Sequence, residues 1–246
     1  MNALAVRDLA KSFGGVQALA GVTLTVAQGE RRAVIGPNGA DKTTLFHAIS
    51  GTIFPSWGTV VLFDREITRL APYERARLGL ARTFQITNLF PGLTVLENVL
   101  LAVCAAAGGG LGLLRPMAAH PRLFEKAERL LEEWGLSASA RRLVRHLSYG
   151  EQRQIELILA LAGSPRLLLL DEPTAGLSPA ETAQVVAMVR SLPREITILM
   201  IEHDMDVAFE LADSITVLHQ GLLIAEGDRE TIRSHPKVSE IYLGVE

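Results

Sequence analysis

A glycine-bearing loop near the N-terminus limits the fold of this chain more than any other feature of its sequence. It reads Gly36-Pro37-Asn38-Gly39-Ala40-Asp41-Lys42-Thr43-Thr44. A strand-like segment, 32–35, precedes the loop, and a helical pattern from Thr43 to Ser50 follows it and ends at Gly51. A strand, a tight loop and a helix in this order are typical of α/β proteins with a mostly parallel sheet.

The rest of the chain continues this alternation. Strands are predicted at 19–26, 58–63, 196–201 and 215–218, and helices at 179–191 and 204–211. The run Leu167-Leu168-Leu169-Leu170 is apolar on both faces, as a strand buried inside a parallel sheet is. A helical stretch interrupts the pattern, with its clearest amphipathic repeat at Leu123, Ala127, Leu130, Leu131 and Trp134. We therefore expect one α/β domain over residues 1–246, with a helical subdomain inserted at 86–162.

Composition excludes few functions. The net charge of −3 gives no electrostatic reason to expect nucleic acid or anionic lipid as the main partner. The only cysteine, Cys104, rules out an internal disulfide and is expected to be buried. The N-terminal residues lack the pattern of a signal peptide. The longest uncharged apolar stretch, 99–114, is shorter than the roughly 18 residues that a membrane helix needs.

The glycine loop matches the phosphate-binding pattern G-x-x-x-x-G-K-[ST] at every position but one. Its amides and the following helix N-terminus would face an anion, with Lys42 on the β- and γ-phosphates and Thr43 on Mg²⁺. The alternative, an ordinary strand–turn–helix junction, loses weight once the later motifs are counted.

Asp41 stands where this pattern has glycine. Its carboxylate adds a charge beside the phosphates, and two unit charges about 4 Å apart repel by roughly 4 kcal/mol at an effective dielectric of 20. Asp41 is also a favourable N-cap residue, so its carboxylate is expected to accept helix amides or to pair with Lys42. In either arrangement it would occupy the position of a phosphate, which predicts weakened nucleotide binding.

Two later segments carry further residues for nucleotide chemistry. Asp171 and Glu172 follow the buried leucine run, where one carboxylate can hold Mg²⁺ through water and the next can deprotonate the attacking water. Ser148 and Glu151, in Leu147-Ser148-Tyr149-Gly150-Glu151-Gln152, form a capping box at the start of a predicted helix. Such a start, with Gly150, leaves amides for an anion such as the γ-phosphate of a nucleotide held by another subunit.

The order of the motifs resembles the ABC ATPase family over nearly the whole chain. Gly36–Thr44 is similar to its Walker A, Leu147–Gln152 to its LSGGQ-type motif and Leu167–Glu172 to its Walker B. Gln85 is similar to the Q-loop glutamine, Ala175-Gly176-Leu177-Ser178 to the D-loop, and His203 to the H-loop histidine; Asp41 and Tyr149 depart from the pattern. The resemblance implies a P-loop NTPase of ABC type, with a mostly parallel sheet core, an N-terminal antiparallel β part and the inserted helical subdomain.

The resemblance also implies roles for single residues. The Walker A loop would bind ATP, with Thr43, Gln85 and Asp171 at Mg²⁺. Glu172 would be the general base, His203 would contact the γ-phosphate, and Ser148, Gly150 and Glu151 would face the ATP of a head-to-tail partner. In a sequence without this order of motifs, a histidine such as His203 would be interpreted as a core or helix-cap residue. Phe13 lies where the family stacks an aromatic on adenine; from the residues alone, a partly buried aromatic before a Gly-Gly turn is an equal alternative.

A narrower resemblance links the chain to importers of branched-chain amino acids, with urea and short-amide relatives. It rests on Thr83-Phe84-Gln85, on 89–99, on 149–154, on Glu202-His203-Asp204-Met205 and on Ile241-Tyr242-Leu243-Gly244. It implies transmembrane permease subunits and a second ATPase subunit as partners, with a periplasmic or extracellular substrate-binding protein as an indirect partner and no nucleic acid. It also implies a peripheral position at the cytoplasmic face of the membrane.

Other functions remain open at this point. In a non-catalytic partner subunit, Asp41 would disable the chain's own site while Ser148 and Gly150 serve a neighbour; the intact Glu172 and His203 argue against this. A soluble ABC protein of DNA repair or translation would usually carry long coiled coils or a second cassette, which the sequence lacks. A P-loop kinase would leave the Ser148–Gln152 segment and His203 without a role.

Overall fold

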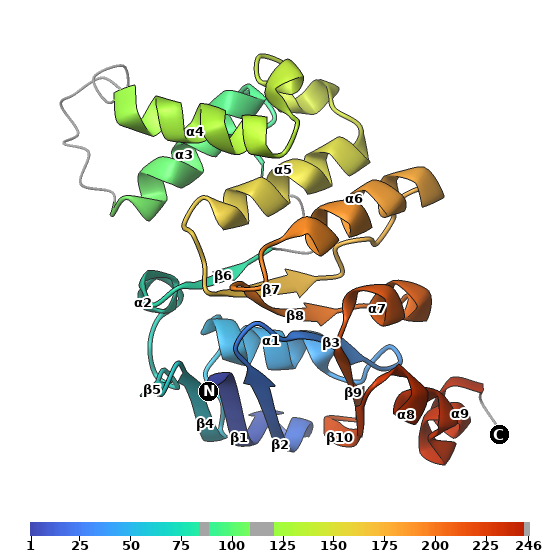
Figure 1. Cartoon of the computed structure of the whole chain (residues 1–246). Coiled ribbons are helices and arrows are strands. Elements are labelled where there is room, and N and C mark those ends of the chain that lie inside the picture. The colour runs from blue at the N-terminus through green and yellow to red at the C-terminus, as the bar shows by residue number, and fades with distance from the viewer. Residues whose placement is uncertain (84–88, 109–120, 244–246) are drawn as a thin grey trace. The chain divides into compact units, whose positions relative to one another are not determined.

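The structure, a computed structural model, describes residues 1–83, 89–108 and 121–243. The chain divides into two compact units (Figure 1). The first comprises Met1–Arg82, Arg166–Ala175 and Leu192–Glu246, and the second comprises Thr83–Pro165 and Gly176–Ser191.

The first unit contains two sheets. The smaller is antiparallel, with strand order β2-β1-β4-β5, and is formed by β1 (Asn2–Phe13), β2 (Val16–Ala27), β4 (Trp57–Leu62) and β5 (Arg65–Glu66). The larger has the order β10-β9-β3-β8-β7-β6 and is formed by β3 (Arg31–Ile35), β6 (Leu80–Arg82), β7 (Leu167–Asp171), β8 (Thr197–Ile201), β9 (Ser214–His219) and β10 (Leu222–Gly227). All its neighbouring strands run parallel except β9 and β10. This arrangement confirms the predicted fold class.

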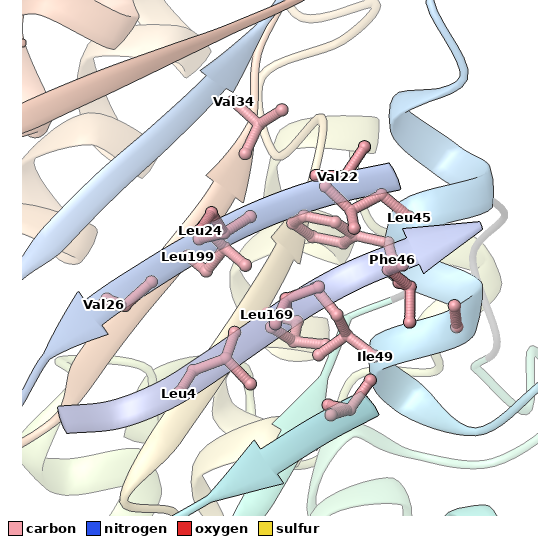
Figure 2. Close-up of a cluster of buried hydrophobic side chains, with 14 of the residues drawn as sticks. Leu4, Val22, Leu24, Val26, Val34, Leu45, Phe46, Ile49, Leu169 and Leu199 are labelled. Atoms are coloured by element: carbon pink, nitrogen blue, oxygen red, sulfur yellow. The ribbon is translucent and has the colours of Figure 1, made fainter. Parts of the chain in front are cut away.

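Among the described residues, five helices belong to the same unit: α1 (Lys42–Ser50), α2 (Pro72–Arg77), α7 (Met205–Leu211), α8 (Arg229–Ser234) and α9 (Pro236–Leu243). Figure 2 shows the core that α1 shares with both sheets. Leu45, Phe46 and Ile49 of α1 contribute to a fully buried cluster that also takes side chains from β1, β2, β3, β7 and β8. The burial of this helix face fixes the helix that follows the glycine loop.

The second unit is helical among its described residues. It contains α3 (Val95–Ala106), α4 (Pro121–Glu133), α5 (Tyr149–Leu161), α6 (Pro179–Ser191) and two short 3₁₀ turns, Ser137–Ser139 and Val144–His146. The amphipathic repeat predicted from Leu123 onward lies on α4 up to Leu131, with Trp134 in the turn that follows; Ala127 and Leu131 are buried. Cys104 on α3 is buried as expected, and burial raises the pKa of its thiol.

Local patterns located most strands and helices but not all. The buried leucine run is β7, fully buried along its length as predicted. The strands β1, β5, β6 and β10 and the helices α2, α8 and α9 carry no prediction, because they alternate less clearly or are short. Part of the apolar stretch 99–114 lies outside the described residues; among those described, no helix has the length and hydropathy needed to cross a membrane.

Arg75 on α2 holds the far end of α1. It is fully buried, and its guanidinium donates to the carbonyl oxygens of Ala48 at 2.7 Å and Ile49 at 2.6 Å, both in the last turn of α1. Two more carbonyls, of Thr68 and Leu70, accept from it at 3.0 and 2.9 Å. Burial lowers its pKa to about 10, but a cation is favourable at a helix C-terminus.

Replacing Arg75 with Met is therefore expected to lower the free energy of unfolding by about 3 kcal/mol, because buried carbonyls lose charged donors. Urea denaturation measures this loss. Arg77→Met is the control: Arg77 is exposed on the same helix, and its replacement should change the free energy by no more than about 0.5 kcal/mol. Equal losses in the two variants would contradict the anchoring role of Arg75.

Candidate functional site

The site follows from the order of four parallel strands. In the larger sheet, β3, β8, β7 and β6 are consecutive neighbours and run in the same direction, so their carboxyl ends lie along one edge. The glycine loop follows β3, and Glu202 and His203 follow β8. Asp171 ends β7 and Glu172 comes next, while Arg82 ends β6. In α/β sheets, ligands bind at this edge.

The glycine loop is held by its own lysine. The ammonium of Lys42 donates to the carbonyl oxygens of Gly36 at 2.6 Å and Pro37 at 3.0 Å. Burial lowers the pKa of Lys42, while the charges of Glu172 and Asp171 act in the opposite direction. Gly36 has to be glycine, since a Cβ there would lie 2.1 Å from the carbonyl oxygen of Leu218. The loop is thus closely packed against Leu218, and the Lys42 ammonium is bound to the carbonyl oxygens of the loop.

The expected contacts of Asp41 are wrong. Asp41 stands at the N-cap position of α1 in the left-handed region, at φ 66° and ψ 27°, and its side chain accepts no helix amide. The carboxylate accepts instead from the Thr44 hydroxyl at 2.9 Å, and Lys42 is bonded to the loop carbonyls rather than to Asp41. The left-handed backbone turns the side chain away from the geometry of a capping residue, which normally has extended torsions. Asp is one of the few non-glycine residues that tolerate these torsions.

Asp171 is paired with a buried arginine. Its Oδ2 lies 2.7 Å from Nη2 of Arg82, and the two side chains are 1% and 6% exposed. Arg82 also donates to the Ser50 hydroxyl at 2.9 Å, so it joins the ends of β6, β7 and α1. A buried carboxylate at this edge would be costly alone, and the guanidinium offsets that cost.

Glu172 and His203 form a second pair. Oε1 of Glu172 lies 2.6 Å from Nε2 of His203, whose side chain is 43% exposed, whereas that of Glu172 is 11% exposed. Glu172 has a φ of 49°, an unfavourable torsion for a residue with a side chain. Its amide donates to the carbonyl of Ile201 at 3.0 Å, and its own carbonyl accepts from Ala175 at 3.1 Å. The strained turn is therefore held on both sides, as turns at functional sites often are.

Glu202 lies buried beside this pair. The residue is 2% exposed, and its carboxylate accepts from the Thr174 hydroxyl at 3.0 and 3.2 Å. Burial raises the pKa of Glu202 to about 7, although hydrogen bonds from the Thr174 side chain and from the main chain of His203 and Thr174 lower it.

The segment Leu147–Gln152, which is similar to the LSGGQ-type motif, lies in the second, helical unit. The predicted capping box is confirmed: Ser148 Oγ accepts from the Glu151 amide at 3.2 Å, and the Ser148 amide donates to the Glu151 carboxylate at 2.8 Å. The Gly150 amide, however, donates to Oε1 of Glu181 at 3.0 Å, and a Cβ on Gly150 would lie 2.6 Å from Glu181 Cγ. Hydrogen bonds from Ser178, first its side chain and then its main chain, and from Gly150 lower the pKa of Glu181 to about 2.

The remaining predicted residues vary in their surroundings. Gln85 lies outside the described residues. Phe13 ends β1 and is 52% exposed, with the Lys11 ammonium 5.0 Å from its ring centroid, so it is more open than a partly buried aromatic. Tyr149, in place of the usual glycine, accepts from Arg153 at 2.7 Å. Tyr242 of α9 receives a hydrogen bond from the main chain of Gly36, while burial raises its pKa to about 12.

The donor set at the strand edge fits a nucleotide and a hard cation. Lys42 and the loop amides suit phosphate oxygens, and the Thr43 hydroxyl and the Asp171 carboxylate are oxygen donors of the kind that Mg²⁺ prefers. Sequence reasoning missed Arg82, Glu202 and Glu181. The partners of Arg82 and Glu202 lie far away in the chain, and their only signal was a charged residue directly beside a motif residue. Glu181 lies three residues after Ser178, the spacing of a capping box, and accepts from the Ser178 hydroxyl at 2.8 Å.

A glycine loop between strand and helix, with its lysine inside and carboxylates after the neighbouring strands, defines a P-loop nucleotide-binding domain. A family model described as "ABC transporter" matches residues 19–175. The chain belongs to this family and is an ATP-binding subunit; members of the family bind ATP, typically with Mg²⁺, and hydrolyse it.

Named relatives agree with this assignment. The chain is 40% identical to the high-affinity branched-chain amino acid transport ATP-binding protein LivG of Salmonella typhimurium, over 98% of this chain and 97% of that protein. It is 39% identical to the high-affinity branched-chain amino acid transport ATP-binding protein BraF of Pseudomonas aeruginosa, over 98% of this chain and 97% of that protein. The ADP conformation of MJ1267, an ATP-binding cassette of an ABC transporter, matches with a TM-score of 0.89, 34% identity and 99% coverage of both chains.

The raised pKa of Glu202 gives a pH-dependent stability. The folded protein keeps this proton up to about pH 7, whereas the unfolded chain releases it near pH 4.5. The contribution of Glu202 is therefore complete below pH 4.5 and is lost as the pH rises to about 7. The expected decrease is roughly 3 kcal/mol in the free energy of unfolding, which Glu202→Gln should lack. Chemical denaturation across this pH range measures it, and parallel curves for the two proteins would contradict it.

Proposed function

We propose that this chain is the ATP-hydrolysing subunit of an importer for branched-chain amino acids or related small polar solutes. The single observation behind hydrolysis is the pairing of Glu172 with His203 beside the lysine-bearing loop, at the edge where four parallel strands end. The transport class rests on the similarity to LivG and BraF, whose names give that function.

The proposed partners follow from the same relatives. Transport ATP-binding proteins act with membrane permeases, so the chain would lie at the cytoplasmic face of the membrane, held by permease subunits. A second ATPase subunit, the same or different, would complete two ATP sites. A dimeric ATP-binding cassette, MJ0796 bound to ADP and Pi, matches this chain with a TM-score of 0.76 and 25% identity over 92% of the chain. An extracytoplasmic substrate-binding protein would be an indirect partner.

In the proposed reaction, Lys42 leaves its loop carbonyls and binds the β- and γ-phosphates of ATP. Glu172 accepts a proton from the water that attacks the γ-phosphorus, the bond from this phosphorus to the β–γ bridging oxygen breaks so that ADP leaves, and His203 contacts the γ-phosphate oxygens. Gln85 would connect this site to the permease side. Thr43 and Asp171 would hold Mg²⁺, which neutralises charge on the phosphates. Phe13 would stack on adenine, where its exposed ring is accessible.

Asp41 is proposed to weaken ATP binding. Its carboxylate holds the hydroxyl of Thr44, in the first turn of α1, where an anion at the helix N-terminus would otherwise find a donor. It also places a negative charge beside the polyphosphate, and the repulsion exceeds the roughly 1.4 kcal/mol that a tenfold change in affinity requires.

Calorimetry with ATP and Mg²⁺ on the chain and on Asp41→Gly tests both proposals. Asp41→Gly is expected to bind at least about tenfold more tightly, because a like charge is removed. Its free energy of unfolding should change by less than about 1 kcal/mol, since relief of the left-handed torsion opposes the added freedom of the unfolded chain. Equal affinities would refute the effect of Asp41. Binding by neither protein would contradict the nucleotide site itself.

Glu181 gives a second test of the proposed head-to-tail dimer. The γ-phosphate of a neighbour's ATP needs the donors of Ser148 and Gly150, and Gly150 now donates to Glu181. Glu181→Gln should therefore lower the ATP concentration for half-maximal dimerisation about fivefold, because a charged acceptor is replaced by a neutral one. Sedimentation velocity would be measured in an Asp41→Gly, Glu172→Gln background. Glu125→Gln, exposed on α4, is the control, and an unchanged or higher ATP requirement for Glu181→Gln would contradict the competition.

A further inference from the structure

Glu202 has no role in the proposed reaction, yet it is a buried ionisable group directly before His203. Only 2% of the residue is exposed, and an uncompensated carboxylate in such a place is unfavourable. Its position follows directly from β8, whose last residue is Ile201. A buried carboxylate at a strand end needs hydrogen-bond donors, and the segments that supply these donors are the ones that Glu202 joins.

The donors come from two segments. Thr174 lies two residues after Glu172, and its hydroxyl is 3.0 and 3.2 Å from the two carboxylate oxygens of Glu202. The main-chain amides of Thr174 and His203 also donate to the carboxylate. One side chain therefore joins the turn after β7, which carries Glu172, to the turn after β8, which carries His203.

The turn after β7 requires such support. Glu172 has a φ of 49°, which residues with side chains rarely adopt, so this backbone is retained only where its surroundings hold it. Main-chain bonds hold Glu172 to Ile201 at 3.0 Å and Ala175 to Glu172 at 3.1 Å. The Thr174–Glu202 contact adds a buried side-chain bond that fastens the same turn to the end of β8.

These contacts close a ring. Glu172 pairs with His203 at 2.6 Å, His203 adjoins Glu202, Glu202 accepts from Thr174, and Thr174 lies two residues from Glu172. We propose that Glu202 is a positioning residue that fixes the general base Glu172 and the γ-phosphate contact His203 relative to each other. The proposal rests on the function proposed above, since it assigns no chemistry to Glu202 itself.

The first test needs no nucleotide. Amide hydrogen exchange of the full chain, measured by NMR above pH 7, would compare the wild type with Glu202→Ala and Thr174→Val. The amides of Glu172 and Ala175 are expected to exchange at least tenfold faster in both variants, while those within β7 and β8 are unchanged. Glu195→Gln, exposed just before β8, is the control and should match the wild type. Unchanged exchange at Glu172 and Ala175, or acceleration across the whole sheet, would overturn the proposal.

The second test separates the γ-phosphate from the rest of the nucleotide. In the Asp41→Gly background, Glu202→Ala is expected to lower the affinity for ATP about tenfold and to leave that for ADP within about twofold, because His203 would contact only the γ-phosphate. Glu202→Gln, which keeps one acceptor oxygen, should lie in between. An equal loss for ATP and ADP would overturn the positioning role. If the background itself bound neither nucleotide, the proposed function would fail, and hydrogen exchange would still decide the role of Glu202.

Discussion

The parallel pairing of β3, β8, β7 and β6 is the constraint on which the site depends. Because the four strands are neighbours and point the same way, their carboxyl ends meet at one edge of the sheet. The residues of the site come from positions as distant in the chain as Gly36 and His203, and no local interaction would bring them together. Strand pairing buries the apolar faces and, in the same step, gathers the polar ends.

Bringing these strand ends together buries charged side chains, and the fold places an oppositely charged or hydrogen-bonding partner beside them. Lys42 and Asp171 are both buried, and each would lose the stabilising effect of water if it stood alone. Asp171 has the guanidinium of Arg82, and Lys42 has loop carbonyls with two carboxylates nearby. The charges of Asp171 and Lys42 are thus partly neutralised by others, so that a polyphosphate and its cation would exchange existing partners rather than enter an unpaired site.

Local sequence patterns predicted the features that depend on neighbouring residues alone, such as a buried strand or a capped helix start. The fully apolar run Leu167–Leu170 required a buried strand, and the spacing of Ser148 and Glu151 required a capped helix start; both are present. The contacts of Asp41 were not predictable in the same way, because they depend on a left-handed backbone that the residue type alone does not reveal. The pairing of Arg82 with Asp171 and the bond from Gly150 to Glu181 were also beyond a local pattern, since both are set by tertiary packing between distant segments.

The buried guanidinium of Arg75 also restricts how the glycine loop can move. It binds the carbonyls of Ala48 and Ile49 at the end of α1 away from the loop, and Arg82 adds a bond to Ser50 in the same turn. A helix fastened at that end cannot slide along its axis when the loop changes shape. A loop that adapts to an anion would then do so through its own backbone torsions, with α1 as a stationary support.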